Sequence, residues 1–163
     1  MTVFVTRMPV GLAGDISRPD ALRVEPIFIN VAKAPTVFGG PVKITAGKAE
    51  IIEVGDTAVS FQGVLARSVP QQGAQTSELF GSGAPPLNQA ADLVREGYVL
   101  VKCPVGTPAR AGVVFMRVVE ALPKKIGDFE ATADGVNSVA LVGVQWQGDK
   151  DANNIAEIFI ASR

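Results

Sequence analysis

The chain has 163 residues, of which 47% are hydrophobic and only 19% are charged, so it can bury one core and is not a disordered polymer. Its net charge of −1 excludes a general attraction to nucleic acid or to an anionic membrane. It contains no histidine, so the usual general base near neutral pH and the commonest metal ligand are both missing.

Residues 1–41 are expected to form an extended arm that belongs to the same domain as the rest of the chain. This stretch carries five of the eleven prolines, which limit the hydrogen bonds that it can donate to a sheet. Arg7 and Pro9 interrupt any hydrophobic region at the N-terminus, so no signal peptide is predicted and the protein is expected to be made in a cytoplasm.

Residues 42–163 are expected to form the compact core. Strands are predicted at 42–45 and 48–54, joined by a tight hairpin turn at Ala46-Gly47. A further strand is predicted over 59–66. Gly63 within it predicts a bulge or a close approach of another backbone segment, because a glycine weakens a strand unless it has such a role.

Residues 68–91 are predicted to be a long polar loop rich in Gln, Ser, Gly and Pro. A loop of this length inside a compact domain is usually either functional or mobile. Leu79 and Phe80 are apolar residues in it that could anchor a contact, although a plain surface loop is the alternative. The only helical candidate is short, at 89–95.

The second half of the chain adds more β-structure, with strands predicted at 98–103, 113–119, 139–146 and 155–161. The last of these has apolar residues on both faces, which predicts burial on both sides or closure of a barrel. Many short strands with turn signals between them favour an all-β domain, either a single compact antiparallel β-barrel or a jelly-roll-like sandwich.

The sequence contains no recognisable catalytic, metal or cofactor site. Cys103 is the only cysteine, so it can form no internal disulfide, and it is predicted to be a small buried hydrophobe. Residues 148–154 have the composition of a calcium loop but not its ligand spacing. The apolar stretch 111–120 is broken by Arg117, too early for a membrane span.

The N-terminal run Arg7-Met-Pro-Val-Gly-Leu-Ala-Gly-Asp15, followed by Arg18-Pro19, resembles the N-terminal signature of the phage structural cement protein family. Later blocks are similar to that family in the same order: Val24-Glu-Pro-Ile27, Gly39-Gly-Pro-Val-Lys43, Gly55-Asp56, Phe61-Gln-Gly-Val64, Gly97-Tyr98, Val101-Lys-Cys103 and Gly106-Thr-Pro108. The resemblance covers nearly the whole chain.

This resemblance implies a non-enzymatic protein of the virion, made in the cytoplasm of a bacterial host. It would bind the outer surface of the assembled phage head and stabilise it by bridging subunits of the major capsid protein. It implies no cofactor, no nucleic-acid partner and no membrane partner. Self-association as a homodimer or a homotrimer is also expected, and the sequence does not choose between the two.

Residues 1–41 are expected to supply contacts with the shell. The candidates in the arm are Arg7, Met8, Pro9, Arg18 and Phe38, and Leu79 and Phe80 are added from the loop. Arg and Met are favoured at interfaces, and an exposed Phe could fill a pocket. The alternative is that the glycines and prolines of the arm only fix turns.

The sequence alone is compatible with three other functions. The first is another β-rich virion component, such as a tail, baseplate or head–tail joining protein. The second is a small hydrolase, which the missing histidine and the missing nucleophile–base pair disfavour. The third is a carbohydrate-binding module, for which one Trp and one Tyr offer few stacking platforms.

Overall fold

The computed structural model describes residues 11–67, 84–85, 87 and 89–162 of the chain. Its strands are β1 (Ile16–Ile29), β2 (Pro41–Thr45), β3 (Lys48–Ile51), β4 (Gly63–Leu65), β5 (Ala90–Lys102), β6 (Val113–Arg117), β7 (Phe129–Glu130), β8 (Ser138–Trp146) and β9 (Ile155–Ile160), and its 3-10 helices are η1 (Val31–Lys33) and η2 (Gly135–Asn137). The predicted mainly-β fold is confirmed. No helix in this part of the chain is long and apolar enough to cross a membrane.

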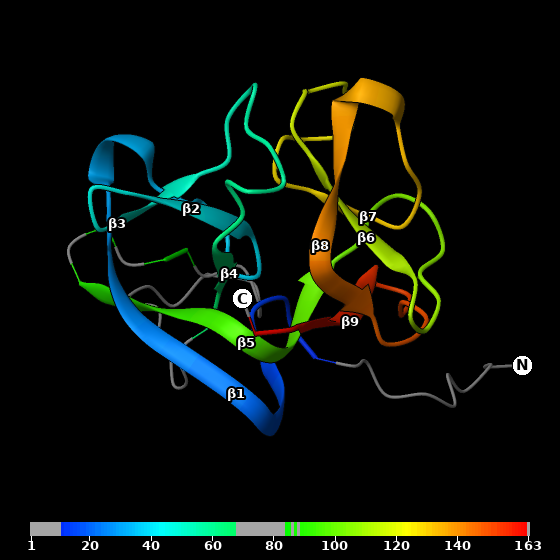
Figure 1. Ribbon diagram of the computed structural model, residues 1–163, viewed down its shortest axis with the longest axis horizontal. Coiled ribbons are helices and arrows are strands. Elements are labelled where there is room, and N and C mark those ends of the chain that lie inside the picture. The colour runs from blue at the N-terminus through cyan, green and yellow to red at the C-terminus, as the bar shows by residue number, and fades with distance from the viewer. Residues whose placement is uncertain (1–10, 68–83, 86, 88, 163) are drawn as a thin grey trace, which may run out of the picture.

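The strands belong to one sheet with the order β1-β3-β2-β4-β5-β9-β8-β6-β7. Because β1 also pairs with β5, the strands β1, β3, β2, β4 and β5 close into a five-strand ring. Figure 1 shows β1–β4 on one side and β6–β9 on the other, with β5 running along both halves. All pairings between strands are antiparallel except that of β1 with β3. The arrangement is compatible with a sandwich.

Strands β4 and β5 form a wall between two hydrophobic clusters. Val64 pairs with Val94, and Leu65 pairs with Leu93. Successive side chains of a strand point to opposite faces, so the two valines pack in the larger cluster of the β6–β9 half, whereas the two leucines pack in a smaller cluster within the five-strand ring. All four side chains are fully buried, and the wall therefore joins the two halves.

Two predictions that rest on glycines are confirmed, a hairpin turn and a close approach of two strands. The hairpin between β2 and β3 turns at Ala46 and Gly47, both with positive φ, as a two-residue hairpin with matching twist requires. Gly63 begins β4 directly against β5, and a Cβ atom there would overlap the carbonyl oxygen of Val94. The predicted strand over 59–66 is shorter than expected, since only Gly63–Leu65 are in a strand.

The helix predicted at 89–95 is wrong, because Ala90–Lys102 form the long strand β5. The helical pattern of this segment reflects burial of both faces of a strand: Leu93 enters one cluster and Val94 the other. Pairing with β1 on one edge and with β4 on the other satisfies its backbone, which overrides the local preference.

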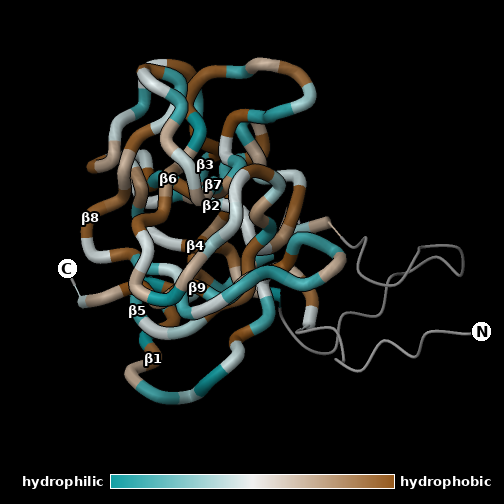
Figure 2. The backbone as a smooth tube through the Cα atoms, turned by 90° about the vertical axis from the view of Figure 1, so that its right-hand side faces the viewer, coloured by the Kyte–Doolittle hydropathy of each residue, from teal (hydrophilic) through white to brown (hydrophobic). Residues whose placement is uncertain are grey.

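Part of the predicted N-terminal arm lies in the sheet. Strand β1 pairs with β5, and the C-terminal end of β1 buries Ile27 and Ile29 inside the five-strand ring. Residues 16–23 are exposed. They project from the body beside β5 in Figure 1, and Figure 2 shows this bend as mainly hydrophilic. The division of the chain at residue 41 into an arm and a core stays a prediction.

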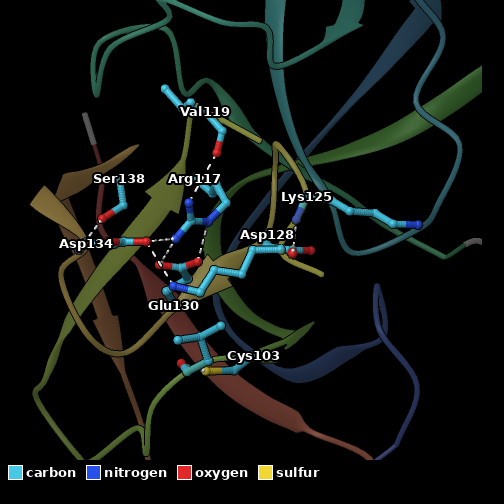
Figure 3. A network of polar contacts seen from close by, with 10 residues as sticks. Cys103, Arg117, Val119, Lys125, Asp128, Glu130, Asp134 and Ser138 are labelled. Atoms are coloured by element: carbon cyan, nitrogen blue, oxygen red, sulfur yellow. Dashed lines mark hydrogen bonds and ion pairs between the residues drawn. The ribbon is translucent and has the colours of Figure 1, made fainter. Parts of the chain in front are cut away.

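A buried ionic network holds the β6–β9 half together at one end (Figure 3). The side chains of Arg117 and Glu130 are both fully buried. Arg117 donates from Nε to Glu130 Oε1 at 2.6 Å and from Nη2 to Glu130 Oε2 at 3.2 Å, which is a bidentate pair. Arg117 also donates to the carbonyl oxygen of Val119 and to Asp134, and Asp134 accepts from Lys124 at 2.9 Å.

The substitution Arg117→Met should therefore lower the free energy of unfolding by about 3–5 kcal/mol, because it leaves the Glu130 carboxylate buried without its partner. The double variant Arg117→Met/Glu130→Leu should recover most of this loss, because no buried charge remains. Urea unfolding followed by circular dichroism measures both. A single variant as stable as the wild type would contradict the assignment of a buried ion pair.

Candidate functional site

Five of the residues expected to contact a partner lie outside the described residues: Arg7, Met8, Pro9, Leu79 and Phe80. The other two, Arg18 and Phe38, are both described, and they lie in very different surroundings.

Arg18 lies at the surface, where it connects the start of β1 to β5 and β9. Its Nε donates to Glu157 Oε1 at 3.0 Å, and its guanidinium carbon lies 4.6 Å from the centroid of the Tyr98 ring. Tyr98 in turn packs on Phe159 with a centroid distance of 4.8 Å. The side chain of Arg18 remains 49% exposed, so it can still reach a partner while holding β1 in place.

The expectation that Phe38 is exposed is wrong. Only 4% of the residue is accessible, and it packs with the cluster inside the five-strand ring. The guanidinium of Arg67 covers it, 4.9 Å from the ring centroid. Gly14 and Gly39 bring the chain into close contact beside it, and this long-range approach gives no periodic signal in the sequence. Phe38 is therefore a core residue of this structure.

An apolar groove lies where the two halves of the molecule meet. It has a volume of about 640 Å³, and its walls come from residues 35–37, 40–41 and 51–54 on one side and from Ile126 and Gly127 on the other. Three large aliphatic side chains that line it are exposed to water: Val37 at 59%, Ile51 at 37% and Val54 at 70%. Exposed apolar surface gathered in one hollow is typical of a binding surface.

The rim of this groove is held by a lysine that bridges two carboxylates. Lys43 Nζ donates to Glu53 Oε2 at 2.8 Å and to Asp56 Oδ2 at 3.0 Å, and Lys33 donates to the same Glu53 oxygen at 2.8 Å. Asp56 also accepts from the backbone N–H of Glu53 at 2.7 Å, which closes the turn. Val54 therefore lies in a turn that these hydrogen bonds hold in place, and its side chain is exposed to water.

The charges at this turn perturb its acids. Hydrogen bonds from Lys33 and then from Lys43 hold the pKa of Glu53 at about 2. Burial by itself would raise the pKa of Asp56, but the N–H of Glu53 and the ammonium of Lys43 outweigh it, so the pKa is lowered. Both carboxylates are consequently charged at neutral pH and keep the turn closed.

The groove is not predictable from the sequence. Val37, Val54 and Ile126 come from three separate segments of the chain. No single-sequence signal marks three distant side chains as neighbours.

The described residues give no sign of a metal site or of a reactive cysteine. No group of three or more Cys, Asp or Glu among them could hold a metal ion. Cys103 is fully buried, as predicted, and burial raises the pKa of its thiol. Its Sγ donates to the carbonyl oxygen of Val105 at 3.3 Å.

Comparison with known proteins gives a match to a family and a likeness to solved structures. The sequence fits the model of one family, described as structural cement protein (E217 gp24/Pam3 gp6), over residues 2–161. Curated protein sequences give no match. Among solved structures, the fold is similar to a chain in "The capsid of Myoviridae Phage XM1", with a TM-score of 0.72 and 16% sequence identity, over 98% of this chain and 95% of that chain. At this identity the likeness shows a shared fold.

The braced turn at the groove predicts a pH-dependent effect of Lys43→Met. The pKa of Glu53 is depressed in the folded state, so its ion pairs add stability above about pH 4.5, and this stability is lost as the pH falls toward 2. The variant should melt below the wild type at neutral pH, and the difference should shrink over that acidic range. Thermal unfolding at several pH values measures the difference in melting temperature between the variant and the wild type. Lys102→Met is the control, because Lys102 is an exposed lysine of strand β5. A difference that does not change with pH would contradict the prediction.

Proposed function

The chain belongs to the structural cement protein family, and we propose on this basis that it binds the outer surface of an assembled phage head and stabilises it by bridging major capsid protein subunits. Membership of the family indicates a structural, non-enzymatic role in the phage capsid. The observation that carries the proposal is the match of the family model over residues 2–161, nearly the full sequence.

The physics of multivalent binding supports the bridging role. A specific interface buries roughly 800 Å² per partner, and one small contact with a shell subunit is weak by itself. Contacts with several subunits at once raise the effective concentration for each further contact. Such a bridge also has to be rigid to resist internal pressure, and the wall of β4 and β5 makes the two halves of this molecule one body.

The contacts with the shell are proposed to come from the N-terminal residues and from residues 68–91, which the sequence predicts to be a loop. The candidates are Arg7, Met8, Pro9, Arg18, Leu79 and Phe80. Arg18 supports this assignment, because it stays half exposed while bound to Glu157. Phe38 is left out because it is buried. Self-association as a homodimer or homotrimer on the shell is part of the same proposal.

Heads prepared without this protein should release their DNA at a lower temperature than decorated heads, because fewer contacts hold the shell closed. Adding the purified chain should restore the higher temperature. Electron microscopy of the restored heads should show the protein in many copies over the outer surface. Equal leakage with and without it would reject the reinforcing role, and a few copies at one vertex would point to a joining or tail protein.

The substitution Arg7→Glu should weaken binding to heads by roughly tenfold or more, which corresponds to the loss of an interface residue that contributes about 1.4 kcal/mol. The matched control is Arg110→Glu, which makes the same charge change at an exposed residue outside the proposed contacts. Binding is measured as copies per head over a range of free protein concentrations. Equal weakening by both variants would show that the change in net charge weakens binding, and it would contradict a specific contact of Arg7 with the shell.

A further inference from the structure

Strand β5 has β1 on one edge and β9 on its other edge, at the same residues. Val99 pairs with Ile16 of β1 and also with Ile158 of β9, and the ladder with β9 covers residues 97–102 of β5. Both neighbours are antiparallel to β5, so β1 and β9 run in the same direction. The start of β1 and the end of β9 therefore point away from each other along the strands.

The chain just before β1 is enclosed by three segments. Gly14 donates to the carbonyl oxygen of Leu100 at 2.7 Å and accepts from the N–H of Arg67 at 2.8 Å. Leu100 donates in turn to the carbonyl oxygen of Asp15 at 2.9 Å, so two residues face one in a β-bulge whose first residue is a glycine with a φ of 93°. Gly39 packs across this bulge, since a Cβ on Gly39 would lie 2.6 Å from the Gly14 nitrogen.

The end of β9 is also bonded on both of its edges. Besides its ladder with β5, β9 pairs with β8, where Ile158 lies opposite Trp146. Beyond the strand, Ala161 donates to the carbonyl oxygen of Gly143 at 2.8 Å. A force applied at the end of β9 therefore acts on two rows of hydrogen bonds.

The direction of a pull decides how these hydrogen bonds are loaded. The hydrogen bonds of an antiparallel ladder are perpendicular to its strands, so sliding one strand along another strains all of them together. Prying two neighbouring strands apart from one end strains them one after another. A pull between the start of β1 and the end of β9 draws these two strands in opposite directions along β5, which is sliding.

We propose that this fold is a load-bearing element, in which β5 resists a pull between the start of β1 and the end of β9 through shear of both ladders. Gly14 anchors the N-terminal side, because β5, Arg67 and Gly39 all hold it. The inference goes beyond the proposed function, since it is a mechanical property of the single chain. It holds whether or not the chain binds phage heads.

Single-molecule force spectroscopy on the full chain tests the proposal by comparing two pulling directions. In the first, handles are attached through tags fused to the two ends of the chain. In the second, they are attached through Lys102→Cys and Asn153→Cys, two exposed residues at the adjoining ends of β5 and β9, so that this ladder is pried open. Cys103 is fully buried, so handles attach only to the engineered cysteines.

The end-to-end pull should need a force roughly twofold or more above that of the second direction, because forced unfolding follows the unfolding rate and shear strains many hydrogen bonds at once. Urea unfolding is the control, and equal free energies of unfolding for the two tagged chains show that direction alone differs. An end-to-end force equal to or below that of the second direction would overturn the proposal.

The substitution Gly39→Ala tests the anchor, because its Cβ displaces Gly14 from the bulge. It should lower the end-to-end force and leave the force between residues 102 and 153 unchanged. Gly148→Ala is the matched control, since the Cβ that it adds meets no atom within 4 Å. An unchanged end-to-end force, or an equal loss in both directions, would overturn the anchor at Gly14.

A milder variant keeps the anchor testable if Gly39→Ala does not fold. Asp15→Ala removes the carboxylate that accepts from the N–H of Leu12 at 2.9 Å, and it adds no atom to the core. The same loss of force in the end-to-end direction alone is expected, and its absence would overturn the anchor. These measurements involve no phage heads, so a failure of the proposed head binding leaves their outcome unchanged.

Discussion

The pairing of β4 with β5 is the interaction on which the rest of the structure depends. It is one short antiparallel contact, Val64 with Val94 and Leu65 with Leu93, but its alternating side chains enter both hydrophobic clusters. Gly63 lets the two backbones approach where a side chain would not fit. The five-strand ring and the β6–β9 half consequently share a wall, and neither half can lose its packing without affecting the other.

Ionic contacts then fix the parts that the two clusters do not hold. The pair of Arg117 and Glu130 is buried inside the β6–β9 half, where its bidentate geometry compensates for the loss of water. The bridge from Lys43 to Glu53 and Asp56 lies at the surface and braces one turn at the groove. The buried pair joins β6 to β7, and the surface bridge joins β2 to the turn at residues 53–56.

A rigid body with a shaped surface suits a protein that acts by contact. The bridging role proposed above requires that force be transmitted between the subunits that the protein touches, and a molecule whose halves moved independently would not transmit it. The groove and the exposed bend of β1 are two surface features of the described part of this body. The bend is held by the contact of Arg18 with Glu157, and the turn at the groove is held by the contact of Lys43 with Glu53.

Local patterns were enough to predict the class of the fold, most of the strands, the hairpin at Ala46-Gly47, the close approach at Gly63 and the burial of Cys103. These patterns are β-branched runs, turn residues and a glycine inside a predicted strand. Long-range contacts make residues 90–95 a strand, bury Phe38 and bring Val37, Val54 and Ile126 together in one groove. Each of these depends on partners distant in the chain, and pairing between distant segments leaves no period in a single sequence.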